Sequence, residues 1–130
     1  EERRRIVAAI YDEKNVPGNA VGFENHLNVF HMRGKGLPLI LAKGLAVYLN
    51  STLVDQYFRI FSGHTQVNAT DLRKIPYPTT AELETLGRGI SSQFPNQDEV
   101  DRIFEEILSR GYEENVSARK CLDGSSRIQR

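Results

Sequence analysis

The sequence predicts an α+β domain in which a small mixed β-sheet packs on a long central helix, with a helical C-terminal part. Short apolar and β-branched runs, separated by turn residues, occupy the first part of the chain. One long stretch with a helical period follows, and then two capped helical segments. The length of 130 residues, with 39% apolar and 26% charged residues, is ordinary for one globular domain.

Three short strands are expected near the N-terminus. They are RRIVAAIYD at residues 4–12, AVGF at residues 20–23 and HLNVFH at residues 26–31. The intervening EKNVPGN supplies Asn, Pro and Gly for a turn. A glycine-bearing basic loop, MRGKG at residues 32–36, follows the third strand. These strands are expected to make the small sheet.

One continuous helix is expected over residues 38–61. Its apolar residues recur at steps of three and four and would form a single buried stripe. The stripe consists of Ala42, Leu45, Ala46, Leu49, Leu53, Tyr57, Ile60 and Phe61. Pro38 suits the first helical turn, and Gly63 stands where a left-handed C-terminal cap belongs. Gly44 lies inside the run and suits close packing or a bend.

Two further helices are indicated by N-terminal capping patterns. Thr79 is followed three residues later by Glu82, and Asn96 is followed in the same way by Glu99. The second of these helices is expected to stop near Gly111. Together they form the helical C-terminal part of the predicted fold.

The domain organisation follows from these elements. Residues 1–111 are expected to form a single domain, and residues 112–130 a polar C-terminal extension. The chain opens on Glu1 rather than a methionine and closes on the polar run DGSSRIQR. We therefore interpret it as a fragment of a larger protein.

The charge of the chain is unevenly distributed. Residues 1–78 hold 10 Lys and Arg against 7 Asp and Glu, a net of +3, whereas residues 79–111 hold 3 against 7, a net of −4. This asymmetry suits a face that approaches a polyanion, and the alternative that charge alone favours is a solvated surface without a binding role. No run is apolar enough for a membrane span and no signal peptide is visible, so a cytoplasmic protein without a membrane partner is expected.

Motifs of catalysis are absent from the sequence. The glycine-containing GKGLP lacks the spacing of a nucleotide-binding loop, and neither a nucleophile elbow nor a metalloprotease helix occurs. The single cysteine, Cys121, allows no internal disulfide, and no Cys and His spacing matches a zinc site. We therefore expect no catalytic, metal-binding or cofactor-binding residue here. An enzyme with a site around His26, His31 and His64 stays open as an alternative.

The stretch SGHTQVNATDLRKIPYP, residues 62–78, carries the candidate binding residues. Gln and Asn side chains can form two hydrogen bonds with an adenine edge, and Thr and His can form one bond to a base or phosphate. Lys and Arg can hold phosphates. The candidate DNA-binding residues are Arg33, Lys35, His64, Thr65, Gln66, Asn68, Arg73 and Lys74. The alternative is a loop whose amides satisfy its own backbone.

The stretch from Gly44 to Pro78 resembles the C-terminal target-recognition region of adenine-specific (N6) DNA methyltransferases of type II restriction–modification systems. In that family a helix bearing LNS and a YFR run leads into SGHTQVN, then DLR and a short P-x-P, all of which stand in this sequence. The upstream ENHLNVFH, residues 24–31, extends the resemblance. A looser form of the pattern is similar to the target-recognition domains of type I specificity subunits.

The resemblance implies a function and its partners. It implies a domain that holds and reads double-stranded DNA for a catalytic methyltransferase domain of the same chain. S-adenosylmethionine is implied as the cofactor of the parent enzyme and not of this fragment, because neither the S-adenosylmethionine loop nor the catalytic N-P-P-Y of that family appears in this sequence. The nearest match to N-P-P-Y, IPYP at residues 75–78, lacks the asparagine. The alternative is a structural packing or protein-interaction domain of the same enzyme without direct base readout.

Overall fold

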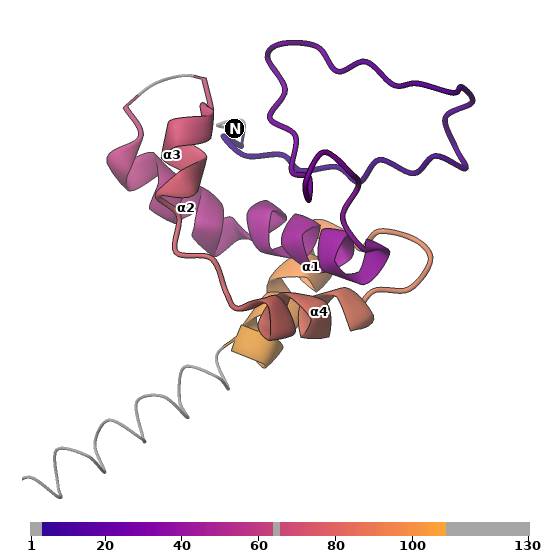
Figure 1. The fold of residues 1–130 in the computed structure, drawn as a ribbon. Helices are drawn as coiled ribbons and strands as arrows, with labels where there is room; N and C mark the ends of the chain where they lie inside the picture. Colours follow the sequence, from indigo (N-terminus) through magenta and orange to yellow (C-terminus); the bar gives the residue numbers. More distant parts are fainter. Residues whose placement is uncertain (1–3, 64–65, 109–130) are drawn as a thin grey trace, which may run out of the picture.

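The computed structural model describes residues 4–63 and 66–108. The regular structure within these ranges is helical and comprises α1 (Leu39–Asn50), α2 (Thr52–Phe61), α3 (Ala69–Arg73), α4 (Thr80–Arg88) and a last helix at residues 97–108. Figure 1 shows α1 in the middle of the molecule, between α4 and an extended N-terminal part. The predicted extension, residues 112–130, lies outside the described residues, as does Cys121.

The prediction of a small mixed β-sheet is wrong. Over residues 4–63 and 66–108, the one β feature is an isolated antiparallel bridge between Met32 and Lys35. The first described residues run extended along the helices, and residues 9–36, which we call the arm, form a wide loop (Figure 1). The apolar, β-branched runs predicted the wrong fold class because β propensity reflects packing against neighbouring strands. The described N-terminal residues have no neighbouring strand to pack against.

Side chains of the helices take the place of a strand partner for the extended N-terminal segment. Asn50 Oδ1 accepts the N–H of Ala8 at 3.0 Å, and Asn50 Nδ2 donates to the Ala8 carbonyl at 2.8 Å. Asp55 Oδ1 accepts the N–H groups of Arg5 at 2.8 Å and Ile6 at 3.1 Å. The backbone of this segment is therefore satisfied by two side chains instead of a sheet.

The predicted helix over residues 38–61 is interrupted at Ser51. The backbone there is extended, with φ −67° and ψ 145°. Ser51 Oγ accepts the N–H of Val54 at 3.3 Å and donates to the carbonyl of Tyr48 at 2.8 Å. Ser51 is therefore the N-cap of α2, and two shorter helices replace the single long one.

The break changes which face of α2 meets the core. Val54 and Phe58 are buried, whereas Leu53, Tyr57 and Ile60 are 60%, 43% and 83% exposed. In α1 the stripe residues Leu45, Ala46 and Leu49 are buried, but so is every other residue from Gly44 to Asn50. In α2 the predicted stripe is wrong, because the interruption at the N-cap resets the helical phase. The expected left-handed cap is also wrong: the helix ends with Ser62 at φ −94°, without a positive φ at the glycine that follows.

α1 and α4 pack with their backbones in contact. A Cβ atom added to Gly44 would lie 1.7 Å from the carbonyl oxygen of Leu83, and one added to Gly87 would lie 2.0 Å from that of Ile40. Only glycine permits this approach, so the close packing expected at Gly44 is confirmed.

Both predicted capping boxes are present. In α4 the Thr79 N–H donates to Glu82 Oε2 at 2.8 Å, and the Glu82 N–H donates to Thr79 Oγ1 at 3.2 Å. The Asn96 N–H likewise donates to Glu99 Oε2 at 3.3 Å, and the Glu99 N–H donates to Asn96 Oδ1 at 3.0 Å. These reciprocal bonds satisfy N–H groups that the first turn of each helix leaves free.

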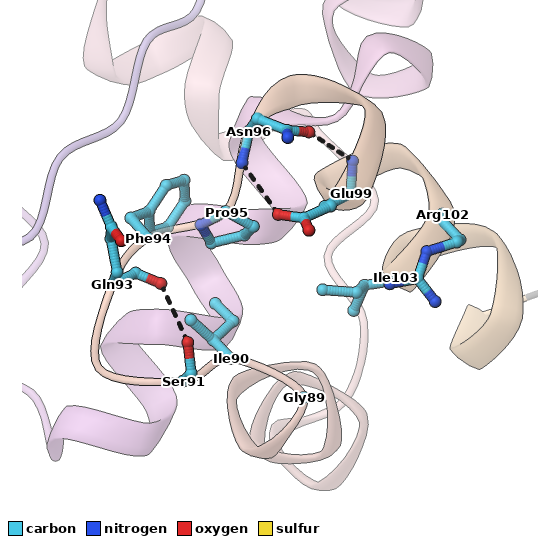
Figure 2. A pocket seen from close by; sticks show the side chains of 10 residues that line it. All are labelled: Gly89, Ile90, Ser91, Gln93, Phe94, Pro95, Asn96, Glu99, Arg102 and Ile103. Atoms are coloured by element: carbon cyan, nitrogen blue, oxygen red, sulfur yellow. Dashed lines mark hydrogen bonds between the residues drawn. The ribbon is translucent and has the colours of Figure 1, made fainter.

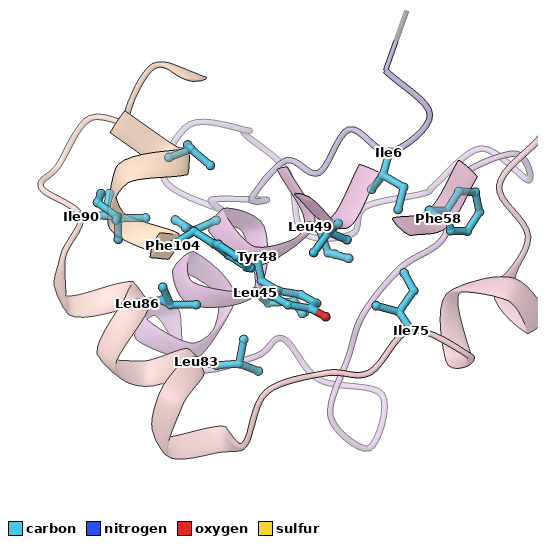
Figure 3. Close-up of a cluster of buried hydrophobic side chains, with 14 of the residues drawn as sticks. Ile6, Leu45, Tyr48, Leu49, Phe58, Ile75, Leu83, Leu86, Ile90 and Phe104 are labelled. Carbon is cyan, nitrogen blue, oxygen red and sulfur yellow. The ribbon is translucent and has the colours of Figure 1, made fainter. Parts of the chain in front are cut away.

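The hydrophobic core has two neighbouring parts, both shown in Figure 3. Side chains of α1, α4 and the last helix form the larger part, which includes Leu45, Tyr48, Leu83, Leu86, Ile90 and Phe104. Ile6, Leu49, Phe58 and Ile75 gather around the junction of α1 and α2. The second part fixes the chain before and within residues 62–78, since Phe58 precedes this segment and Ile75 belongs to it.

Candidate nucleic-acid interface

The candidate segment, residues 62–78, is organised by the buried carboxylate of Asp71. The Asp71 N–H donates to Asn68 Oδ1 at 2.8 Å, which makes Asn68 the N-cap of α3. Asp71 Oδ2 accepts bonds from Asn68 Nδ2 at 2.9 Å and from Ser62 Oγ at 3.4 Å. Because a buried carboxylate is stable only with such donors, these contacts tie the start of α3 to the end of α2.

The Tyr48 hydroxyl holds the second half of the segment against α1, and the Tyr77 hydroxyl closes that half on itself. Tyr48 donates to the carbonyl of Pro76 at 2.7 Å, and Tyr77 donates to the carbonyl of Leu72 at 2.8 Å. The two rings pack with centroids 5.6 Å apart. Burial raises the pKa of both hydroxyls above the ordinary tyrosine value. The IPYP sequence therefore packs along α1 through Pro76 and Tyr77.

The cationic residues of the segment lie at the end of α3. Arg73 is the last residue of that helix and is exposed. The Lys74 side chain is 61% exposed, and its Nζ lies 3.4 Å from Asp71 Oδ1. Because the lysine end of this pair is exposed and the contact is long, Lys74 remains available to a phosphate.

Arg33 and Lys35 lie on one tight turn in the arm. Met32 and Lys35 exchange both backbone N–H···O bonds at 2.9 Å, and the two residues between them have positive φ, 51° at Arg33 and 77° at Gly34. The N–H of Gly34 also donates to His31 Nδ1 at 2.9 Å. This turn presents two exposed cations within four residues.

The arm meets the candidate segment at two points. Asn28 Nδ2 donates to the carbonyl of Val67 at 2.9 Å. The rings of Phe30 and Tyr77 pack edge to face with centroids 6.3 Å apart. These contacts place the arm beside Val67 in the first half of the segment and Tyr77 near its end, although arm and segment lie far apart in the sequence.

The structure groups some of the predicted residues and leaves others apart. Asn68 and Lys74 meet at Asp71, and Arg33 and Lys35 share their turn. Within the part of the chain that the structure describes, no hydrogen bond or ion pair joins these two groups. Gln66 is exposed, and His64 and Thr65 lie outside the described residues. Base contact by any of them stays a prediction.

Two residues with structural hydrogen bonds, Asp71 and Asn28, are not among the predicted site residues. The DLR run alone does not reveal the role of Asp71. The spacing N-x-x-D does, because an N-cap asparagine accepts the N–H of the residue three positions later. Asn28 was read as part of a strand. No local pattern identifies its bond to Val67, because the two residues are brought together only by the fold.

Of the three histidines in the alternative of an enzyme site, the structure describes His26 and His31, and both make local contacts. His26 contacts the carboxylate of its neighbour Glu24, and His31 accepts the Gly34 N–H within its own turn. Among the described residues, no three His, Cys, Asp or Glu side chains lie close enough to hold a metal ion. None of the described helices is both long and apolar enough to cross a membrane.

An open pocket lies between the end of α4 and the last helix (Figure 2). Phe94 lines it beside Asn96 and Glu99, which already bond to each other's backbone N–H groups. None of the predicted binding residues lines this pocket. We therefore assign the pocket no part in the interface.

Comparison with known proteins identifies relatives of one kind. The chain is 50% identical over 108 residues to the type II methyltransferase M.PstI of Providencia stuartii, covering 83% of this chain and 21% of that protein. It is also 50% identical over 110 residues to the type II methyltransferase M.BsuBI of Bacillus subtilis, covering 83% of this chain and 22% of that protein. No family model and no solved structure matches. The chain is therefore similar over most of its length to type II methyltransferases and spans about a fifth of the length of these relatives.

Proposed function

We propose that this chain is the target-recognition region of an adenine-specific (N6) DNA methyltransferase of a type II restriction–modification system. It holds and reads duplex DNA for a catalytic domain in another part of the same polypeptide. The observation that carries the proposal is the 50% identity to two type II methyltransferases, which includes most of this chain. The resemblance of residues 44–78 to the target-recognition regions of such enzymes supports it.

Hydrogen bonds anchor the candidate segment on both sides of Gln66, as base reading requires. Asp71 holds Ser62 and Asn68 by hydrogen bonds, and the Tyr48 hydroxyl holds Pro76. Anchored residues therefore stand on either side of Gln66. Preorganised side chains lose less conformational entropy on binding, which sharpens discrimination between bases. In this proposal Gln66, with His64 and Thr65, reads base edges in the major groove.

The cations have a separate role in the proposal. Arg33, Lys35 and Arg73 are exposed and hold phosphates, which gives affinity that depends on salt and not on sequence. The target adenine is turned out of the duplex into the catalytic domain, where S-adenosylmethionine supplies the methyl group. This chain supplies neither cofactor ligands nor a catalytic group.

A second candidate is a packing domain of the same enzyme without base readout. One observation favours it: much of the resemblance motif has a structural role. Asn50 and Ser51 of the LNS sequence anchor the N-terminal segment and cap α2, and Asn68 caps α3. The two candidates therefore differ in what is expected of Gln66.

The deciding experiment replaces Gln66 in a methyltransferase that carries this chain as its matched region. M.PstI with its matched 108 residues exchanged for these provides such an enzyme. Methylation is measured on the preferred site and on each single-base variant of it. Gln66→Ala is expected to weaken discrimination at one base by roughly 5- to 150-fold, the equivalent of about 1–3 kcal/mol.

Gln56→Ala is the matched control, because Gln56 is an exposed glutamine on α2. It is expected to leave both activity and base preference unchanged. If Gln66→Ala, Thr65→Ala and His64→Ala all behave like Gln56→Ala, the packing domain replaces the reading domain as the function.

A further inference from the structure

The arm exposes an unusual amount of apolar surface. Every residue from 13 to 36 is exposed. Eight large hydrophobic side chains of the arm are between 38% and 60% exposed: Tyr11, Val16, Val21, Phe23, Leu27, Val29, Phe30 and Met32. Single exposed apolar residues are common, but eight of them on one loop point to an interaction surface.

The arm is held in place although it buries little. Asn50 pairs with Ala8 before its first residue, and Asn28 pairs with Val67 near its end. Between these points the rings of Tyr11 and Phe23 contact edge to face, 6.2 Å apart, and join the outgoing and returning parts of the loop. The apolar side chains are therefore presented from a loop with defined ends and one internal contact.

The charge of the arm argues against nucleic acid as the occupant of this surface. Residues 15–32 contain one acidic residue, Glu24, and no Lys or Arg. Binding to a phosphate backbone requires cations, and the cations of the arm lie outside this stretch, at Lys14 and at the turn with Arg33 and Lys35. Apolar side chains with almost no charge fit an apolar protein surface.

The relatives show how much protein is available to cover it. The matched part is 21% of one relative and 22% of the other, so roughly four fifths of each lies outside the match. We infer that the arm docks on this remaining part of the methyltransferase, with Phe23 and Leu27 at the centre of the contact. The identity of the occupant rests on the proposed function, whereas the docking does not depend on base reading.

Such docking has a consequence for the candidate segment. Because Asn28 bonds to Val67, an arm held by the catalytic part also holds the loop next to Gln66. The arm then sets the distance between the reading segment and the catalytic site. This positioning role differs from base contact, and no residue of the arm's apolar set needs to touch DNA.

The test is site-specific photo-cross-linking in a methyltransferase that carries this chain as its matched region. Phe23 is replaced by benzoylphenylalanine, which keeps the ring, and cross-linked peptides are identified by mass spectrometry with and without DNA. Phe94→benzoylphenylalanine is the matched control, since Phe94 is 41% exposed and Phe23 is 49% exposed. We expect the Phe23 probe alone to cross-link to a peptide outside the matched region, within one polypeptide and without DNA.

A second measurement, of the melting temperature, tests the docking independently of the photochemical probe. Leu27→Asp is expected to lower the melting temperature of the enzyme, whereas Asn25→Asp, at an exposed polar position of the same arm, leaves it unchanged. Cross-links only to DNA, only to a second copy, or no cross-link together with an unchanged melting temperature of Leu27→Asp would each overturn the inference. The base preference of Gln66→Ala is measured separately, so failure of the reading function is distinguishable from failure of the docking.

Discussion

Asn50 pairs with the backbone of Ala8 through both groups of its side-chain amide, at 3.0 Å and 2.8 Å. The same amide donates to the carbonyl of Ala46 at 2.8 Å. One buried side chain thus performs for the N-terminal segment the pairing that a neighbouring strand performs in a sheet. It is also the asparagine of the LNS sequence on which the family resemblance partly rests.

Replacement of Asn50 by Ala is expected to lower the free energy of unfolding by on the order of 2–3 kcal/mol, because three hydrogen bonds worth about 0.5–1.5 kcal/mol each are lost. Urea denaturation measures the change. Asn25→Ala, which removes an exposed amide in the arm, is the control and should have no effect. Equal stability of the two variants would show that the amide pairing contributes nothing.

Gly44→Ala and Gly87→Ala are expected to destabilise the fold by at least about 1–3 kcal/mol, since each new Cβ meets a backbone carbonyl that cannot move independently of its helix. Helix propensity alone favours alanine by only about 1 kcal/mol, so the clash is expected to dominate. Thermal unfolding measures the loss. Gly36→Ala is the control, because a Cβ there has no atom within 4 Å. A stabilised Gly44→Ala variant would contradict the close crossing.

Stability is expected to fall on acidification as Asp55 and Asp101 take up protons. Burial alone would raise the pKa of Asp55, but bonds from the Ile6 N–H, Arg59 and the Arg5 N–H outweigh it and hold the pKa below its ordinary value. Burial likewise opposes the bonds from Thr52 and Gln97 that lower the pKa of Asp101. The unfolded chain therefore binds these protons more readily. The stabilisation is complete above about pH 5 and is lost as pH falls through the lowered folded-state values.

The measurement is the urea midpoint between pH 6 and pH 3. The double variant Asp55→Asn and Asp101→Asn should be less stable at pH 6 and should lose less stability on acidification. Asp98→Asn, an exposed carboxylate of the last helix, serves as the control for removal of one charge. A double variant with the full pH dependence of the parent chain would refute the assignment.

Asn68 and Gln66 are expected to respond differently to truncation. Asn68→Ala removes the N-cap of α3 and a bond to Asp71, so it should cost about 1 kcal/mol of stability, with a range of roughly 0.5–2 kcal/mol. Gln66→Ala, at an exposed position, should leave the melting temperature unchanged. Asn68→Ser, which can still cap, should recover most of the loss. The cap would be unimportant if Asn68→Ala melted with the parent chain.

Arg33→Gly is expected to maintain or raise stability while weakening binding to DNA. The residue has φ 51°, a left-handed conformation that costs a non-glycine residue roughly 1–2 kcal/mol. Loss of one phosphate contact should flatten the slope of log affinity against log salt by about one unit. Arg33→Lys retains the charge and should retain the slope, and Arg88→Gly, remote on α4, should also retain it. An unchanged slope in Arg33→Gly would remove Arg33 from the interface.

Some features of this protein were determined by local sequence. The capping boxes at Thr79 and Asn96 depend on side chains three residues apart, and the close packing at Gly44 depends on the absence of a side chain. The burial of Leu45, Ala46 and Leu49 in α1 was predicted correctly, because one uninterrupted helix obeys a single phase. The relationship to methyltransferases was likewise visible in contiguous residues.

The tertiary structure decided the rest. RRIVAAIYD has strand propensity, but a strand requires a partner, and in this chain Asn50 and Asp55 satisfy its backbone instead. Ser51 is compatible with a helix interior or a cap, and its bonds to Tyr48 and Val54 select the cap and turn Leu53 outward. The contact of Asn28 with Val67 joins the arm to the candidate segment, and no local pattern contains it. Such pairings depend on which distant groups the fold brings within hydrogen-bond distance, and that is determined only when the helices have packed.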